Sequence, residues 1–155
     1  MQISSRFTIA IHVLVCMETF KEEYKVTSEF LASSVSVNPV VVRKVLGQLK
    51  KAGIVTNTRG SRGAKLARPL GEITLFDIYQ AVECLESGEL FHFHENPNPQ
   101  CPVGRNIHSV LDGRLWRVQR AMEQELSHIT MEDIFLETRE KLEAEKGESG
   151  EEKNF

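Results

Sequence analysis

The sequence predicts a mostly α-helical fold with a small β wing, in which a winged helix-turn-helix domain precedes a long dimerisation helix. Residues 37–54 form one amphipathic segment with a basic outer face, directly after a shorter helical pattern. Residues 54–68 contain two strand-like stretches around a glycine-rich turn. Residues 103–127 place apolar side chains at coiled-coil-like spacing. A chain of 155 residues, 41% of them hydrophobic, is long enough for one core and an appendage.

Two helices are predicted before the basic segment. Residues 4–18 read as a core helix capped by Ser4 or Ser5. Its apolar residues at helical spacing are Phe7, Ile11, Leu14 and Val15. After a charged loop, Thr27 or Ser28 caps a short helix. That helix carries Phe30, Leu31 and Val35. Two short helices joined by a tight turn, the second one basic, predict a helix-turn-helix.

The helix expected within residues 37–54 has one face for a core and one for a partner. Asn38 is a favourable N-cap and Pro39 suits the first helical position, so the helix has a sharp start whose dipole can point at a phosphate. Gly53 supplies the stop. The apolar stripe consists of Val42, Val45, Leu46 and Leu49. The opposite face holds Val40, Lys44, Gly47 and Lys51, with Arg43 and Gln48 beside it.

The charge is divided unevenly along the chain. Residues 30–71 contain no Asp or Glu. The basic residues of that stretch are Arg43, Lys44, Lys50, Lys51, Arg59, Arg62, Lys65 and Arg68. Residues 1–70 carry a net charge of +7 and residues 71–155 carry −10, which together give the overall −3. A basic half joined to an acidic half predicts that the first half binds a polyanion.

A basic wing is predicted after the basic helix. Residues 54–58 and 64–68 read as two strands, and residues 59–63 form an Arg-Gly-Ser-Arg-Gly turn. Glycines permit positive φ angles and a close approach of the backbone to another group. Arg59 and Arg62 offer guanidinium forks for phosphate or for a narrow minor groove. A helix-turn-helix followed by such a hairpin is a winged helix.

A further helix is predicted after the wing. Pro69 and Gly71 end the wing, and Thr74 caps the helix with Asp77 at the capping-box distance. Its inward residues are Ile78, Ala81 and Val82. The first domain is therefore expected to span residues 1–83.

The second half of the chain is predicted to contain a regulatory loop, two helices and a tail. Residues 84–105 lack periodicity and contain three prolines, two histidines and two cysteines, so we expect a sensor loop. A long helix is expected from Pro102 or Val103 to about Ser127, within a region for dimerisation at 106–142. Its apolar stripe consists of Ile107, Val110, Leu111, Leu115, Val118, Met122 and Leu126. Thr130 begins a last helix with Ile134, Phe135 and Leu142, and the acidic tail at 143–155 is expected to be disordered.

These segments resemble the Rrf2 family of dimeric winged-helix transcription regulators, which includes the iron–sulfur-cluster regulator and the cysteine-metabolism repressor. The segments that carry the resemblance are SSRFTIAIHVLV, TSEFLASSVSVNPVVVRKVLGQLKKAGIV, RGSRGAKLARP, ITLFDIYQAVE and HENPNPQCPVG. The resemblance covers nearly the whole chain. It implies a bacterial homodimer on a palindromic operator in double-stranded DNA, with the recognition helix in the major groove and the wing in the minor groove.

The resemblance also implies roles for particular residues. It places Asn38, Val40 and Arg43 where the family contacts bases, and Arg59 at the wing position. Residues at the predicted helix starts and basic residues of the helix and wing join this set. The candidate DNA-binding residues are therefore Thr27, Asn38, Pro39, Val40, Arg43, Lys44, Lys51, Arg59, Ser61 and Arg62. The alternative interpretation is a solvated basic surface, which the absence of acids and the capped helix disfavour.

This sequence departs from the family pattern at two places. The family wing commonly reads arginine-glycine-proline-glycine-glycine, whereas Ser61 and Arg62 stand here in place of the proline and the next glycine. Cluster-binding members carry three closely spaced cysteines in the loop, whereas only Cys101 stands here. Cys84 lies at the preceding helix end and Cys16 in the first helix. We therefore expect no cofactor, no iron–sulfur cluster and no metal.

Cys101 is the candidate sensor. It is expected at the N-terminus of the long helix, where the helix dipole favours the thiolate. The thiolate is the form that reacts with an oxidant or electrophile. The alternative is a thiol that only packs or caps. His92 and His94 nearby offer metal-ligand atoms, but their spacing matches no tight metal motif, so they are expected to line a loop or pocket. Cys16 is expected to be a buried core thiol.

The residues together predict a sequence-specific, homodimeric transcriptional repressor that responds to a redox, electrophile or small-molecule signal. The rival interpretation is a winged-helix module that binds proteins without preferring any DNA sequence. An enzyme is not expected, because no His–Cys–Asp set, phosphate loop or metal spacing is found. No apolar run reaches the length of a membrane span, and three widely spread cysteines favour a reducing cytoplasm.

Overall fold

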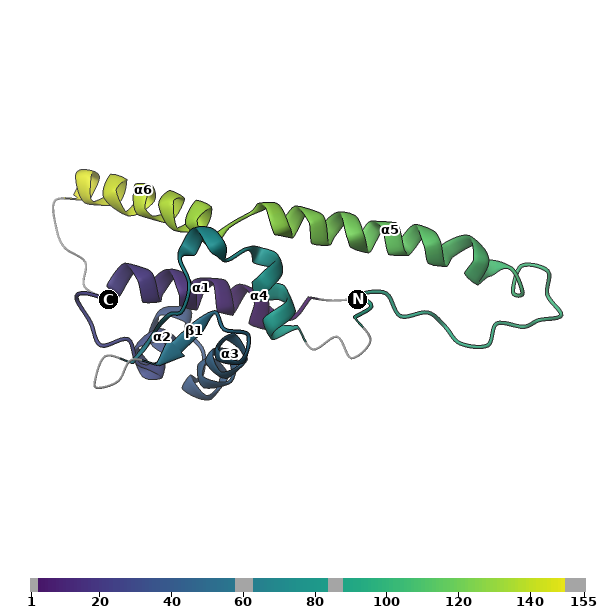
Figure 1. Cartoon of the computed structure of the whole chain (residues 1–155), viewed down its shortest axis with the longest axis horizontal. Coiled ribbons are helices and arrows are strands. Elements are labelled where there is room, and N and C mark those ends of the chain that lie inside the picture. Colours follow the sequence, from purple (N-terminus) through teal and green to yellow (C-terminus); the bar gives the residue numbers. More distant parts are fainter. Residues whose placement is uncertain (1–2, 58–62, 84–87, 150–155) are drawn as a thin grey trace.

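The computed structural model describes residues 3–57, 63–83 and 88–149, and it confirms a mostly helical winged-helix fold. The elements in chain order are α1 (Ser5–Phe20), α2 (Ser28–Val35), α3 (Pro39–Lys51), β1 (Val55–Asn57), β2 (Ala64–Leu66), the 3-10 helix η1 (Leu70–Glu72), α4 (Leu75–Val82), α5 (Ile107–His128) and α6 (Met131–Ser149). In Figure 1, helices α1 to α4 and the wing form a body from which α5 projects as a long arm. The loop before α5 runs outward along that arm to its far end, where α5 begins and returns toward the body.

The helix-turn-helix is set by local capping. The side chain of Thr27 accepts a hydrogen bond of 3.1 Å from the Phe30 N–H, which satisfies the first turn of α2. Helix α2 ends at Val35, and the following residue, Ser36, has a φ of 60° and so adopts the left-handed conformation that turns the chain. The Val37 N–H then donates to the carbonyl of Ala32. These short-range contacts fix the direction in which α3 starts.

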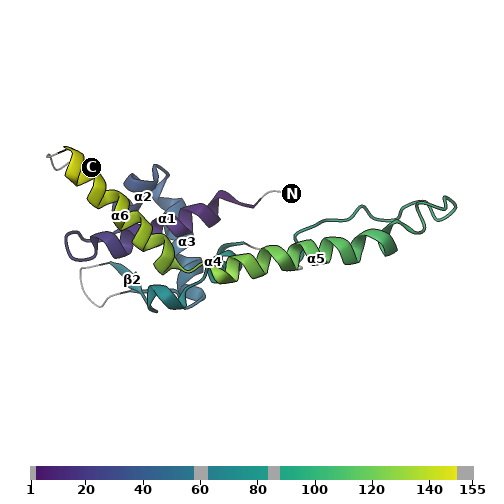
Figure 2. The ribbon, with the colours of Figure 1, turned by 90° about the horizontal axis from the view of Figure 1, so that it is seen from above.

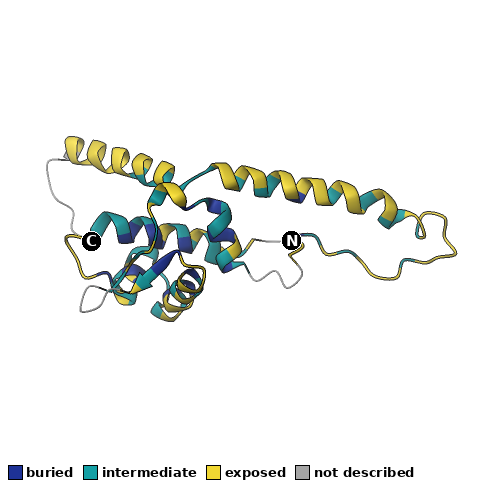
Figure 3. Ribbon diagram, in the orientation of Figure 1, coloured by how far each residue is buried: buried dark blue, intermediate teal, exposed yellow. Residues whose placement is uncertain are grey.

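The core lies between α1, α3 and α4. Val42, Val45 and Leu49 of α3 are fully buried, as their spacing predicts, and they join residues of every other element of the body. The largest fully buried side chains outside α3 are Val13, Leu14, Leu31, Ile54, Ile73, Ile78, Val82 and Met131. Figure 3 shows buried residues concentrated in this body, whereas α5 and α6 are mostly exposed.

The wing consists of two antiparallel strands, of which β1 begins one residue later and β2 ends two residues earlier than predicted. Val55 pairs with Leu66, Thr56 with Lys65, and Asn57 with Ala64. The turn that would carry Arg59, Ser61 and Arg62 lies outside the described residues, so their predicted positions stay predictions.

The arm is anchored to the body by the junction between α5 and α6. Leu75 N–H donates to the Ile129 carbonyl at 2.9 Å, and Met131 N–H donates to the Ile73 carbonyl at 2.8 Å. Thr130 and Asp133 form a reciprocal cap at the start of α6, so the predicted start of the last helix is confirmed. Figure 2 shows α6 lying across the body while α5 extends away from it.

Two boundaries differ from the sequence predictions. Helix α5 starts at Ile107, not at Pro102 or Val103, because the preceding residues form separate turns. The Arg105 N–H donates to the Cys101 carbonyl, and the Asn106 side chain donates to the Pro102 carbonyl at 2.7 Å. Helix α6 continues to Ser149, so residues 143–149 of the expected disordered tail are helical.

The helical extension of α6 has a local cause. Its last turns consist largely of glutamate, alanine and lysine, which form helices readily without burial. Arg139 and Glu143 lie 3.6 Å apart at a spacing of four residues, and so, at 3.9 Å, do Glu137 and Lys141. Because burial alone does not predict these turns, the helix was expected to end too early.

Candidate nucleic-acid interface

Helix α3 begins at a capped and exposed N-terminus. The Asn38 Oδ1 atom accepts a hydrogen bond of 2.9 Å from the Val40 N–H, and Pro39 occupies the first turn, as predicted. No acidic side chain lies in this first turn. The positive end of the helix dipole therefore faces outward without a competing carboxylate from α3 itself.

The outer face of α3 is exposed along its length. Val40 has 61% of its surface exposed, and Lys44, Gly47 and Lys51 are exposed on the same face. This confirms the division into a buried and a solvent face that the sequence predicts. An exposed apolar side chain followed by two lysines on one face offers a contact for a thymine methyl group and cations for phosphates.

Glu29 is the residue that the sequence argument missed. It precedes the acid-free stretch by one residue and lies in the first turn of α2. Its Oε1 atom is 3.2 Å from Nη1 of Arg43, and both side chains are more than half exposed. The guanidinium expected to read bases is therefore held by a carboxylate in this structure. An acidic residue opening the first helix of the motif was the available signal, but the pairing itself depends on the packing of α2 against α3.

The base of the wing is fixed beside the start of α2. Gly63 forms a parallel bridge with Val26, directly before the N-cap Thr27. Gly63 has a φ of 81°, and a Cβ atom there would overlap the carbonyl oxygen of Val26. The close approach that a wing glycine allows is thus to the chain's own backbone. This contact places the wing hairpin next to α2 and α3.

The other candidate residues of this surface divide into two groups. The Thr27 oxygen accepts a hydrogen bond from Phe30, so its hydroxyl proton is the group that can contact a phosphate. Lys65 is exposed on β2. Arg68, in contrast, is tied to the body: its Nη1 donates to the Glu72 carbonyl at 3.3 Å and its Nη2 lies 3.8 Å from Asp77. Arg68 therefore belongs to the scaffold rather than to the exposed basic face.

Cys101 is exposed, but it does not lie at a helix N-terminus. It precedes α5 by six residues and sits in the turn that ends at Arg105. Backbone N–H groups of Gly104 and Val103 donate to the sulfur and lower the pKa of the thiol below its ordinary value. The expected direction of the pKa shift is thus found, whereas its cause is a turn rather than the dipole of the long helix.

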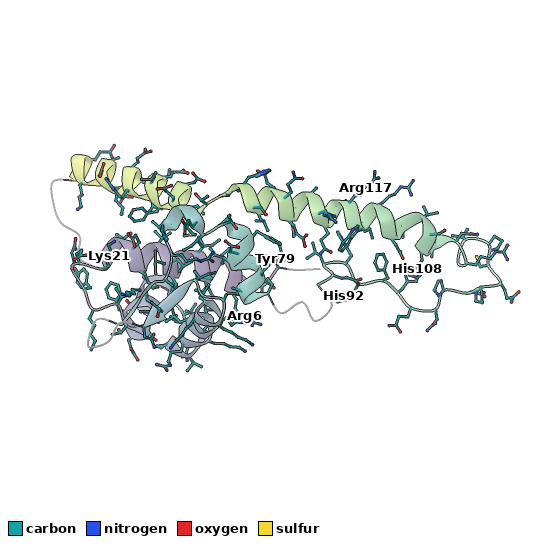
Figure 4. All side chains as sticks on the ribbon, viewed as in Figure 1. Arg6, Lys21, Tyr79, His92, His108 and Arg117 are labelled. Atoms are coloured by element: carbon teal, nitrogen blue, oxygen red, sulfur yellow. The ribbon has the colours of Figure 1, made fainter. Side chains whose placement is uncertain are left out.

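The two histidines of the loop are also exposed. His94 stacks on His108 of α5 with ring centroids 5.4 Å apart. The His108 ring contacts the His94 carbonyl through Nε2 and Asp112 through Nδ1, at 3.2 and 3.3 Å. His92 lines the polar pocket on this side of the loop, so a pocket position is confirmed for both histidines. Figure 4 shows His92 and His108 on the arm, away from the basic face of α3.

The buried position expected for Cys16 is confirmed. Its sulfur lies 3.1 Å from the Ser34 hydroxyl, and burial raises the pKa of the thiol. Cys84 lies outside the described residues. Within residues 3–57, 63–83 and 88–149, no three His, Cys, Asp or Glu side chains converge to hold a metal ion. Within the same ranges, no helix combines the length and apolarity of a membrane span.

Comparison with known proteins shows which family this chain resembles in sequence and fold. Residues 3–137 match the family model Rrf2, which is described as an iron-dependent transcriptional regulator. The chain is 46% identical over 132 residues to YwnA of Bacillus subtilis (strain 168), named as a candidate HTH-type transcriptional regulator. That match covers 85% of this chain and 96% of YwnA.

Solved structures agree with this assignment. A crystal structure described as a candidate DNA-binding protein is 39% identical, with a TM-score of 0.66, and covers 84% of this chain and 98% of its own. IscR of T. potens shares the fold with a TM-score of 0.65 at 20% identity, covering 89% and 88% of the two chains. Since the family model spans most of the sequence, the chain belongs to the Rrf2 family of transcriptional regulators.

Proposed function

We propose that the protein is a homodimeric repressor that binds a palindromic operator in double-stranded DNA through α3 and the wing. The observation that carries the proposal is the outer face of α3, where Val40, Lys44 and Lys51 are exposed beside a capped N-terminus. A helix about 20 Å long with such a face has the size and charge that a major groove accepts.

Affinity and sequence preference come from different residues in this proposal. Lys44 and Lys51 neutralise phosphates, which supplies most of the affinity and makes it depend steeply on salt. Arg43 reads a guanine edge, and each good bidentate contact is worth about 1–3 kcal/mol of discrimination. To do so, Arg43 has to exchange the Glu29 carboxylate for DNA. Such an exposed ion pair costs only about 0.2–1 kcal/mol to break.

The dimer is proposed to form through α5. Val110 and Val118 are 48% and 54% exposed, and eight residues of helix place them on the same side. Ile107 and Leu111 extend that side toward the start of the helix. A second copy that packs its own α5 along this stripe would place two copies of α3 on one face of a two-fold assembly, which is the arrangement a palindrome requires.

The signal is proposed to enter through the loop that contains Cys101. Its thiol is exposed, and its lowered pKa favours the thiolate, the form that reacts with oxidants and electrophiles. The loop is tied to α5 through His94 and His108, so a change at the loop acts on the proposed dimer helix. Operator release would follow if the modified loop favoured a different dimer geometry.

The proposal is tested by selecting bound sequences from random-site DNA with the purified protein. Enrichment of one palindrome, lost in an Arg43→Ala, Arg59→Ala double variant but kept in an Arg139→Ala control on α6, is expected. Salt-sensitive binding without enrichment would instead support the protein-interaction module. Operator release by oxidants that persists unchanged in Cys101→Ser would refute the proposed sensor.

A further inference from the structure

The arm contains a cavity that the DNA-binding proposal does not use. It has a volume of about 390 Å³ and lies between the loop at 88–93 and α5. Glu89, Phe91 and Phe93 line it from the loop, and Asp112, Trp116 and Gln119 from the helix. A volume of this size falls within the range of small-molecule sites in proteins. In Figure 4, His108 lies on the side of α5 that faces the loop, whereas Arg117 points away from the loop.

The cavity is held open by a buried polar contact. Gln119 is only 2% exposed, although it is polar and lies in a mostly exposed helix. Its Oε1 accepts from the Leu90 N–H at 2.9 Å, and its Nε2 donates to the Gly88 carbonyl at 2.7 Å. The same amide nitrogen donates to Glu123 at 2.9 Å. These bonds fix the loop to the helix at Gly88 and Leu90, directly before the aromatic residues that line the cavity.

The lining defines the charge of a suitable ligand. Three aromatic rings, those of Phe91, Phe93 and Trp116, meet the carboxylates of Glu89 and Asp112, and no lining side chain is basic. Aromatic faces attract cations, and carboxylates strengthen this attraction. The Trp116 ring already makes one cation–π contact, since the guanidinium carbon of Arg120 lies 5.9 Å from the ring centroid. Among the lining side chains, an anion would find two carboxylates and no cation.

We propose that this cavity binds a small organic cation, an ammonium group on an aromatic or aliphatic body. The ammonium lies against the aromatic faces near Asp112, and the apolar body fills the space beside Leu115 and Phe91. Val110 and Val118 of the stripe proposed for dimerisation do not line the cavity, whereas Leu115 of the predicted apolar stripe does. The binding site stands independently of the proposed function, and only its use as a signal for operator release rests on it.

The test uses Trp116, the single tryptophan of the chain, as the reporter. Its fluorescence is titrated with benzyltrimethylammonium, with the neutral isostere neopentylbenzene and with the anion benzylsulfonate, in the full chain without DNA. Saturable binding of the cation, at least about tenfold tighter than of either analogue, is expected. Equal binding of the cation and its neutral isostere would overturn the proposal, as would no saturable change with the cation.

Variants locate the site. Asp112→Asn is expected to weaken cation binding about fivefold to tenfold, with no change for neopentylbenzene, and Glu140→Gln on exposed α6 serves as the matched control. An equal loss in both variants would place the cation elsewhere and refute the assignment. If Asp112→Asn fails to fold, the comparison of the two isosteres on the wild-type chain decides. Because these measurements contain no DNA, their failure is distinguishable from failure of operator binding.

Discussion

Replacing Gly63 by alanine is expected to destabilise the protein much more than replacing Gly53, although both glycines have positive φ angles. Gly53 has a φ of 74° and open space around an added Cβ, whereas an added Cβ at Gly63 would overlap the backbone of Val26. The two substitutions share the cost of a left-handed alanine, about 1 kcal/mol. They also share the gain from a stiffer unfolded chain, so the difference between them isolates the clash.

The clash cannot be relieved by a rotating side chain, because the atoms in the way are the Val26 carbonyl carbon and oxygen. Either the bridge to Val26 breaks or the wing shifts, and overpacking of this kind costs about 2 kcal/mol more. In a chain of this size, 1 kcal/mol corresponds to about 2–4 °C in Tm. Before the shared gain from the unfolded chain is subtracted, Gly53→Ala should lower Tm by about 2–4 °C and Gly63→Ala by about 6–12 °C.

Thermal unfolding followed by circular dichroism measures both values, and a DNA titration at a temperature where both variants are folded completes the assay. Gly63→Ala should bind DNA more weakly than Gly53→Ala, because the base of the wing is displaced from α2. Equal Tm values for the two variants would refute the contact between Gly63 and Val26 as the anchor of the wing.

Three further predictions concern single side chains. Glu29→Gln should leave the free energy of unfolding within about 0.5 kcal/mol of wild type, because the pair with Arg43 is exposed, and should raise DNA affinity about twofold to fivefold at low salt. Unchanged affinity in a titration would show that the carboxylate does not compete with DNA. Gly47→Ala should raise the free energy of unfolding by about 1 kcal/mol in a melt, since the added Cβ meets open space in mid-helix. If α3 lies close to DNA, the same variant should bind DNA more weakly. Unchanged binding would contradict that placement. Because its pKa is lowered, the Cys101 thiol ionises at a lower pH than an ordinary thiol, whereas the pKa of the buried Cys16 is raised. Iodoacetamide at pH 7 should therefore modify Cys101 well before Cys16. Equal rates of modification by mass spectrometry would contradict both assignments.

Features that depend on neighbouring residues were predictable from the sequence. Asn38 and Pro39 start α3, and Thr74 pairs with Asp77 in a capping box, because caps depend on residues within one turn. The buried stripe of α3 was predictable for the same reason, since helical periodicity alone decides which residues share a face.

Features that depend on distant contacts were not predictable. Glu29 meets Arg43 only because α2 packs across α3, and Gly63 meets Val26 only after the wing has folded. The start of α5 was placed too early because the turn at Cys101 is closed by contacts with the preceding loop, where the Cys101 N–H donates to Asn98. The cavity beside Trp116 likewise requires a loop and a helix that the sequence separates.

The salt dependence of binding to the selected palindrome tests the central claim most directly. It is measured for the wild type, for Lys44→Ala on α3 and for Lys141→Ala on α6. If α3 lies on DNA, Lys44→Ala reduces the slope of log K against log salt by about 1 for each copy of the lysine that contacts a phosphate, and Lys141→Ala leaves it unchanged. Identical slopes for all three proteins would show that the exposed face of α3 does not contact DNA.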